Sequence, residues 1–153
     1  MCNPTALIKI PLPPFSQNGA YFRNRKYNTK ARNYREKFLS FLMLESNQEQ
    51  IKLITSKFNS KLHGLKVDFL FYQPRNIIFT QKGHLSRRSQ DVDNCFKLAT
   101  DFLFNAKYPE KFDITNFNID DQFIIELSGA HKISLDDEFL ITVAVSLLPL
   151  SDL

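Results

Sequence analysis

Three polar side chains near the middle of the chain have the types and the spacing used in metal-assisted phosphate chemistry. Asp91 and Asp93 lie two residues apart in the segment DVDNCFK, and Lys97 follows Asp93 by four residues. Residues two apart in an extended segment point to one side, and residues four apart on a helix lie one turn from each other. Carboxylate oxygens suit Mg²⁺ or Mn²⁺, and an ammonium beside them can neutralise charge on a phosphate oxygen. The spacing therefore predicts a divalent-cation site beside a phosphate.

A purely structural interpretation of the same segment also stands. Asp93 is a good candidate for a helix N-cap, and Asp93 with Lys97 is an ordinary helical ion pair. A calcium-binding EF-hand loop that began at Asp91 would need Gly in sixth place and Glu in twelfth, where the chain has Phe96 and Phe102. The EF-hand is therefore excluded, whereas the capping role is not.

Two more acidic clusters follow. Asp120 and Asp121 directly precede the apolar segment QFIIEL, and a carboxylate at a strand entrance can reach a helix N-terminus in the neighbouring layer. This pair is therefore a candidate for the third anionic ligand of a metal-dependent phosphodiesterase centre, with ordinary turn chemistry as the alternative. The trio at 136–138 has the composition of a turn and is assigned to one.

The residues that other catalytic classes need are not grouped in the sequence. The histidines His63, His84 and His131 are scattered, and neither cysteine has a second Cys or His at zinc-ligand spacing. Glycine occurs only four times, with no G-x-G-x-x-G and no phosphate-binding P-loop. We therefore expect no nucleotide cofactor.

Charge divides the chain by sign. Residues 1–90 hold 16 Lys and Arg against 4 Asp and Glu, whereas residues 91–153 hold 4 against 12. The most basic stretch, 19–37, also interleaves tyrosine and phenylalanine. This polarity predicts a surface that faces a polyanion beside a carboxylate-rich centre, with solvated helix faces as the alternative. The basic residues that we expect to contact a nucleic-acid backbone are Arg23, Arg25, Lys26, Lys30, Arg87 and Arg88.

Hydrophobic periodicity predicts the elements that must position these groups. Alternation at every second residue indicates strands, and recurrence at every third or fourth residue indicates helices. The two late strands are expected to form a hairpin through a turn near 134–137, and the segment 76–90 is expected to be a loop that contains a small hairpin. The predicted strands cover 6–10, 65–72, 123–127 and 139–147, and the predicted helices 30–46 and 94–105, with a second periodic segment at 51–62 after a break at 46–50.

The length and composition predict one domain that spans residues 1–153. With 153 residues, 43% hydrophobic and 24% charged, the chain can bury a substantial core without disulfides or structural metal. The expected class is α/β (mixed α+β), with a mixed sheet of about four strands and two main helices packed on it. No apolar run is long enough for a signal peptide core or a membrane span, so a cytoplasmic protein is expected.

The order of several motifs resembles the RusA family of Holliday-junction resolvases. The similar segments are IPLPPFSQNGAYFR, RRSQDVDNCFKLATDFL, IDDQFI and a lysine in the later pair HK, and together they extend over most of the chain. The most specific part is the basic run that leads into D-x-D-N-x-x-K, followed by D-x-L and later by D-D-x-Q. The resemblance implies a small mixed α/β homodimer that cuts four-way DNA junctions with magnesium, through symmetric nicks in DNA recombination and repair.

Carried over by position, the resemblance also implies roles for individual residues. The metal-binding acids would be Asp91, Asp93 and Asp121, with Asp120 as second choice, and Lys97 would be a cation in the region of the catalytic base. Asn18 matches an asparagine usual in the N-terminal motif, which implies a contact with DNA or with the active site. The segments 76–86 and 105–118 look inserted, which affects dimer packing or junction choice but removes none of the acids.

Two other functions remain open at this point. A non-catalytic nucleic-acid-binding protein would account for the basic half and for the aromatic residues, which could stack on unpaired bases. A different magnesium nuclease, one that acts on flaps or forks, would use the same acidic centre.

Overall fold

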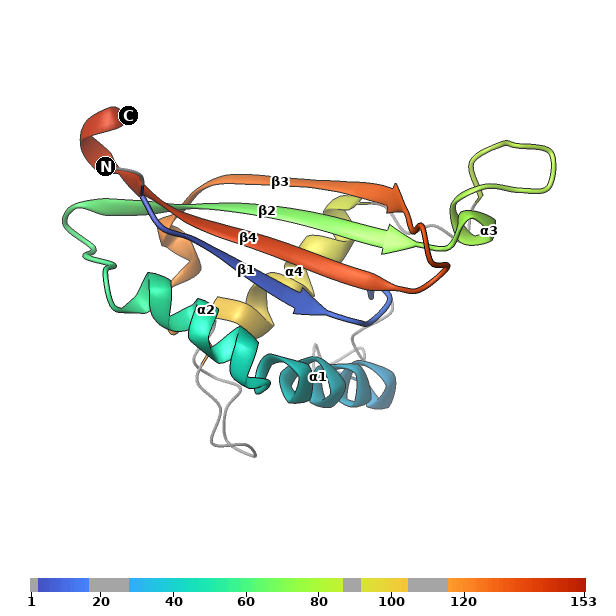
Figure 1. Ribbon diagram of the computed structural model, residues 1–153, viewed down its shortest axis with the longest axis horizontal. Helices are drawn as coiled ribbons and strands as arrows, with labels where there is room; N and C mark the ends of the chain where they lie inside the picture. Colours follow the sequence, from blue (N-terminus) through green and yellow to red (C-terminus); the bar gives the residue numbers. More distant parts are fainter. Residues whose placement is uncertain (1–2, 17–27, 87–91, 105–115) are drawn as a thin grey trace.

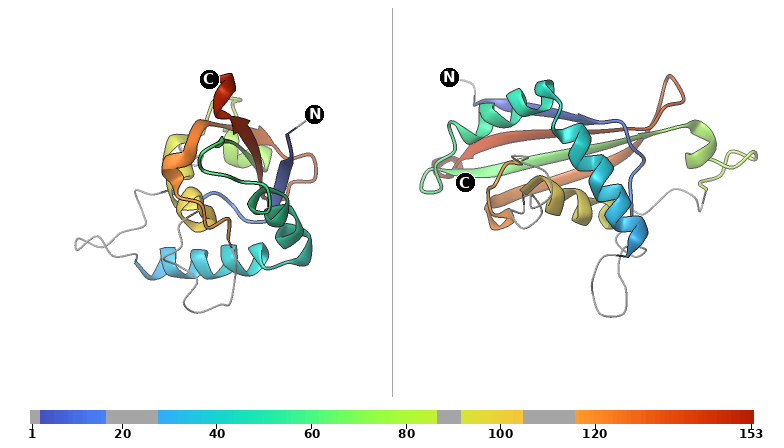
Figure 2. Two further views of the ribbon diagram at one scale, coloured as in Figure 1. Left: turned by 90° about the vertical axis from the view of Figure 1, so that its left-hand side faces the viewer. Right: turned by 90° about the horizontal axis from the view of Figure 1, so that it is seen from below.

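Four strands form one mixed sheet, and the longer helices lie on one of its faces (Figures 1 and 2). The computed structural model describes residues 3–16, 28–86, 92–104 and 116–153, and for 92–94 the backbone alone. The chain is a small single α+β domain. Its strands are β1 (Thr5–Ile10), β2 (His63–Gln73), β3 (Ile124–Ile133) and β4 (Leu140–Pro149), and its helices are α1 (Thr29–Leu42), α2 (Glu45–Thr55), the short α3 (Arg75–Ile78), α4 (Val92–Phe104) and the single 3₁₀ turns η2 (Asp121–Phe123) and η3 (Leu150–Asp152).

The strand order across the sheet is β1-β4-β2-β3, with β2 and β3 parallel and the other pairs antiparallel. The four-strand mixed sheet was predicted correctly, but the late hairpin was wrong because β2 lies between β3 and β4. The chain from β2 to its parallel neighbour β3 passes through α4, as a parallel connection requires. The small hairpin after β2 is present as a bridge between Phe79 and Leu85.

The predicted helix boundaries were partly wrong. Instead of one helix over 30–46, α1 ends at Leu42 and α2 begins at Glu45, so the expected break at 46–50 is in fact the first part of a helix. The cause is Asn47, a polar residue that suggested a loop but is buried, with 3% of its surface exposed. Its side chain accepts a hydrogen bond from the Lys9 N–H and donates to the carbonyls of Lys9 and Phe41.

Asn47 and Gln50 close the outer edge of the sheet at β1. Gln50 Oε1 accepts from the Leu7 N–H at 2.9 Å, and Asn47 Oδ1 accepts from the Lys9 N–H at 3.1 Å. These N–H groups would otherwise be free to pair with a strand from another molecule. The amide side chains of α2 therefore take the place of a fifth strand.

The other edge of the sheet, β3, contains an irregularity at its start. The register shifts between Leu65 and Lys66, so that Ile125 is the extra residue of a β-bulge. The Ile125 side chain lies over Gly64, where a Cβ would stand 2.0 Å from the Ile125 Cδ1. Gly64 is therefore needed for close approach at this bulge, and the regular part of β3 begins at Glu126.

Aromatic rings join α4 to the sheet and to α1. Phe96 packs on Phe69 and Phe71, with ring centroids 5.4 and 6.1 Å apart, and Phe102 packs on Phe38 at 5.3 Å. Burial of such rings contributes about 1.5–3 kcal/mol each relative to exposure. The position of α4 is thus fixed at both of its ends. Within the described ranges, no helix is both long enough and apolar enough to cross a membrane.

The first prediction concerns the edge formed by α2. Asn47→Ala removes three hydrogen bonds and leaves part-buried groups of Lys9 and Phe41 without partners, so we expect the free energy of unfolding to fall by about 2–3 kcal/mol. The matched variant Gln50→Ala removes one exposed bond and should cost less than about 1 kcal/mol. Urea unfolding measures both, and equal losses would contradict the role given to Asn47.

Candidate functional site

The first two turns of α4 carry the acid and the ammonium that the sequence singled out. The helix begins at Val92, so Asp93 lies within its first turn and the prediction that Asp93 is the N-cap was wrong. Lys97 lies one turn later and is exposed. Asp91, the other predicted ligand, falls outside the described residues, as does the side chain of Asp93.

The contacts of Phe96 place the start of α4 at one end of the sheet. Phe96 is three residues after Asp93 and packs on Phe69 and Phe71, which pair with Gly129 and His131 of β3. The helix therefore begins near the carboxyl ends of the parallel strands β2 and β3. Loops at this end of parallel strands commonly form binding sites in α/β proteins.

Asp121, the predicted third ligand, lies toward the other end of α4. It belongs to η2, directly before Ile124, which pairs with Leu65 near the start of β2. The chain just before it adjoins the last turn of α4, where the Phe117 N–H donates to the Leu103 carbonyl. A single chain therefore does not bring Asp121 next to the first turn of α4.

Asp120, the second choice among the acids, has a local structural role. Its Oδ1 accepts from the Gln122 N–H at 3.0 Å and so caps η2. This is the turn chemistry considered as the alternative for the pair.

The Asp136 carboxylate acts similarly in the turn after β3. The pKa of Asp136 is lowered by the hydroxyl of Ser134, which donates to it, and then by the N–H of Glu138. The assignment of 136–138 to a turn is confirmed.

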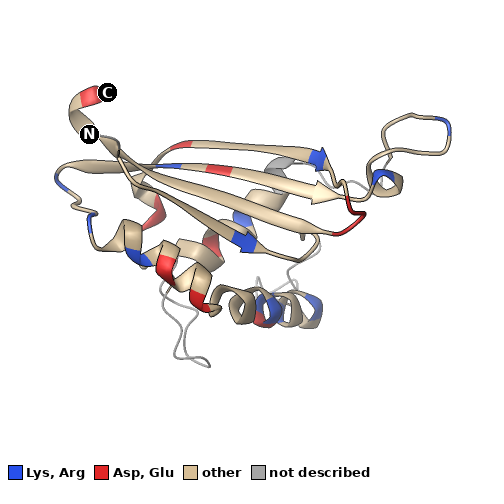
Figure 3. Ribbon diagram, in the orientation of Figure 1, with Lys and Arg blue, Asp and Glu red and all other residues tan. Residues whose placement is uncertain are grey.

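Basic side chains gather along α1, which packs against α4 (Figure 3). Lys30, the one predicted DNA contact among the described residues, is exposed in the first turn of α1, and Arg32 and Lys37 are exposed farther along. Tyr34 and Phe38 on the same helix pack on Phe102 of α4, with ring centroids 6.4 and 5.3 Å apart, so α1 lies beside the second half of α4. The basic helix α1 is therefore in contact with the helix that carries Asp93 and Lys97. The remaining predicted contacts, Asn18, Arg23, Arg25, Lys26, Arg87 and Arg88, lie outside the described residues.

A polar pair at the same end of the sheet, made of a buried glutamine and a half-buried histidine, was missed from the sequence. Gln73 is 2% exposed, and its Nε2 lies 2.9 Å from Nδ1 of His131, whose ring packs on Phe71. A donating Gln73 amide leaves the proton of a neutral His131 ring on Nε2. The available signal was the inward-facing alternation of β2, which continues past Phe71 to a glutamine, a polar residue at a core position.

The donor chemistry of the predicted acids suits Mg²⁺, because aspartate oxygens are its usual protein ligands. Among the residues that the structure describes, no three His, Cys, Asp or Glu side chains are grouped as a metal site would need. The predicted centre thus depends on Asp91 and on the Asp93 side chain. The sequence matches no protein-family model and no curated protein.

A second prediction concerns Tyr34, which ties the segment after β1 to α1 and α4. Its hydroxyl donates to the Pro13 carbonyl at 2.7 Å, and its pKa is raised by removal of the hydroxyl from water and then by Cys95. The folded chain thus keeps this proton to higher pH than the unfolded chain. Its stabilising contribution is complete below the ordinary tyrosine pKa of about 10 and is lost as pH rises further.

Tyr34→Phe should therefore flatten the fall of unfolding free energy above about pH 10. Urea unfolding at a series of alkaline pH values measures the slope. Tyr72→Phe, which removes a hydroxyl from the uncovered face of the sheet, serves as the matched variant for nonspecific effects. Identical slopes for wild type and Tyr34→Phe would show that the Tyr34 proton is not linked to folding.

Proposed function

We propose that the protein is a magnesium-dependent endonuclease that acts on branched DNA, with the four-way junction as its substrate. One observation carries the proposal: α4, whose first two turns hold Asp93 and the exposed Lys97, packs against the basic helix α1. Metal-assisted hydrolysis of a DNA phosphodiester uses a cation-binding group that lies next to a surface that binds the phosphate backbone.

Asp91 and Asp93 are assigned as the primary metal ligands. A cation bound there would lower the pKa of a water molecule and stabilise charge on the phosphate. The Lys97 ammonium, one helical turn away, adds positive charge next to the scissile phosphate. Asp121 is assigned as the third acid, and because α4 separates it from Asp93 in one chain, it would join the centre from a second copy.

The basic residues hold the DNA backbone in this proposal. Lys30 is the described member of this set, exposed in the first turn of α1, and would hold a bound strand on the helix that packs against α4. Contacts to phosphate give affinity without sequence readout, and this affinity falls steeply with salt. The pairing of two active sites in a homodimer would allow two symmetric nicks in one junction.

Cleavage assays on synthetic four-way junctions, forks, flaps and linear duplexes, each with Mg²⁺ and with EDTA, test the proposal. Preferential, metal-dependent nicking of the four-way junction is the expected result. Preference for flaps or forks would instead identify a different magnesium nuclease. Binding without a metal-dependent product on any substrate would favour the non-catalytic nucleic-acid-binding protein.

The third prediction separates catalysis from binding. Asp93→Asn should lower the junction-cleavage rate by more than about 100-fold, because loss of a ligand exceeds the roughly 10–100-fold cost of losing an outer-shell partner. Affinity for the junction should be unchanged. Asp137→Asn is the matched control, since it makes the same change in a turn where the backbone has a φ of 58° that asparagine tolerates. Loss of binding by a folded Asp93→Asn variant would count against the assignment.

The fourth prediction concerns phosphate contacts. Replacing Arg87 and Arg88 with glutamine should weaken junction binding and reduce the slope of log affinity against log salt by about 2 per chain, and so by about 4 for the homodimer. Lys57 and Lys61, exposed near the start of β2 and far along the sheet from α3, provide a control pair with the same loss of charge. Fluorescence anisotropy at several salt concentrations gives the slopes. A wild-type slope in the arginine variant would remove these residues from the interface.

A further inference from the structure

The two edges of the sheet are treated differently by the fold. At β1, side-chain amides of α2 bond to the outward N–H groups of Leu7 and Lys9 and to the Lys9 carbonyl. At β3, the described residues provide no such cap for the backbone of 126–130, and no described element lies beyond it (Figure 1). An open strand edge of this kind is a template for pairing with another strand.

The β3 edge is also apolar on the side of the sheet that the helices occupy. Leu127 and Ile133, which face that side, are 46% and 39% exposed. Natural proteins usually protect such edges with charges, proline or a covering element. Here the bulge at Ile125 protects the first residues of the strand, and the regular segment 126–133 carries only two charged side chains, Glu126 and Lys132, both on the opposite face from Leu127.

In the regular segment 126–133, the two charged residues have opposite signs and lie where an antiparallel copy of the same strand would bring them face to face. A two-fold axis perpendicular to the sheet at Gly129 would place Glu126 opposite Lys132 of the partner subunit, and Lys132 opposite the partner subunit's Glu126. The same register places Leu127 opposite His131 and Ser128 opposite Ala130. Centring the axis one residue either way would place Glu126 opposite Ala130 or Ser134 and lose both charge pairs.

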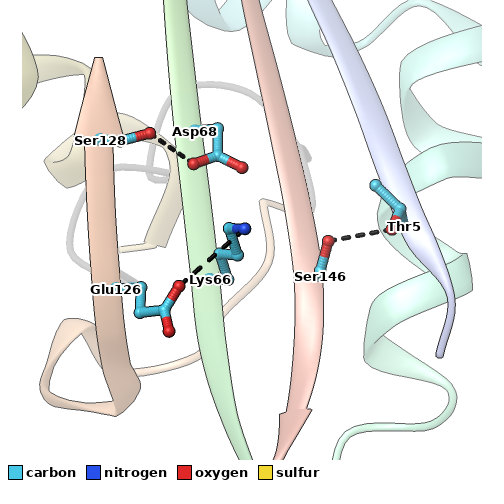
Figure 4. A network of polar contacts seen from close by, with 6 residues as sticks. All are labelled: Thr5, Lys66, Asp68, Glu126, Ser128 and Ser146. Carbon is cyan, nitrogen blue, oxygen red and sulfur yellow. Dashed lines mark hydrogen bonds and ion pairs between the residues drawn. The ribbon is translucent and has the colours of Figure 1, made fainter.

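The side chains near Glu126 leave it available for this contact (Figure 4). Its neighbour within the chain is Lys66, at 4.0 Å, and the two side chains are 55% and 42% exposed. On the same face, the Ser128 hydroxyl donates a hydrogen bond to the Asp68 carboxylate, so Asp68 has its partner within the chain. Glu126 can therefore face Lys66 on one side and a lysine from another chain on the other.

We propose that β3 pairs antiparallel with β3 of a second copy about an axis at Gly129, so that two four-stranded sheets become one of eight strands. We assign the partner strand to a second copy of this chain because Glu126 and Lys132 face each other in this register. Both residues belong to β3, so two copies of this one strand supply both ion pairs. The proposal uses no nuclease activity. The pairing also concerns the proposed metal centre. It would bring η2 of each copy, which contains Asp121, alongside the end of the sheet at which α4 of the other copy begins.

Charge reversal tests the register, and sedimentation equilibrium gives the dimer dissociation constant. Glu126→Lys and Lys132→Glu should each raise this constant roughly tenfold, because each turns two attractive pairs into repulsive ones. The double variant should restore it to near the wild-type value. Within one chain the two residues lie roughly 20 Å apart, so the rescue can act only between copies.

A disulfide test works even if the charge variants associate weakly. With Cys2 replaced by serine, Glu126→Cys with Lys132→Cys in one chain should form a cross-linked dimer on mild oxidation, since opposed strand residues are within disulfide distance. Glu126→Cys alone should not, because the two copies of residue 126 lie roughly 20 Å apart. A monomeric wild type, failure of the double charge reversal to restore association, or cross-linking by the single cysteine would each overturn the proposal. Nuclease activity enters none of these readouts, so failure of the interface is distinct from failure of the proposed function.

Discussion

The packing of α4 between the sheet and α1 is the interaction on which the candidate site depends. Phe96 fixes the first half of the helix on Phe69 and Phe71, and Phe102 fixes the second half on Phe38. Because β2 and β3 are parallel, the connecting helix must run back along them, so its first turn lies at the carboxyl ends of the strands. The first turn of α4, which contains Asp93, therefore shares one end of the molecule with the Gln73–His131 pair.

The same crossover explains why Asp121, the proposed third acid, lies away from the first turn of α4. A residue just before β3 lies near the start of both parallel strands, whereas a residue at the start of α4 lies near their ends. Asp121 and Asp93 are thus separated by the length of a helix within one chain. Antiparallel pairing of two β3 strands would instead place Asp121 of one copy at the same end of the joined sheet as the first turn of α4 of the other copy. The edge interface and the composition of the centre are consequently linked, although each rests on separate observations.

Much of the fold followed from local patterns in the sequence. The alternation of β2 and β4 and the stripe of α4 located these elements to within a few residues, because each buries one regular face. The order of strands did not follow, since the short link between β3 and β4 resembled a hairpin and nothing local shows that β2 enters between them. The helix break predicted at 46–50 was wrong for a related reason. The sequence does not distinguish an asparagine that is buried against a sheet edge from one that lies in a loop. The acidic motif predicted a cation site, but its spacing held no information about which end of α4 Asp121 would occupy.

The central claim is that a divalent cation binds at the first turn of α4. Anomalous diffraction from crystals soaked in Mn²⁺ measures this most directly, because the metal position is obtained without reference to activity. The expected result is a manganese peak roughly 2.0–2.6 Å from carboxylate oxygens of both Asp91 and Asp93, the range spanned by Mg²⁺ and Ca²⁺ sites. Well-ordered carboxylates that point apart, with no manganese between them in any copy, would contradict it.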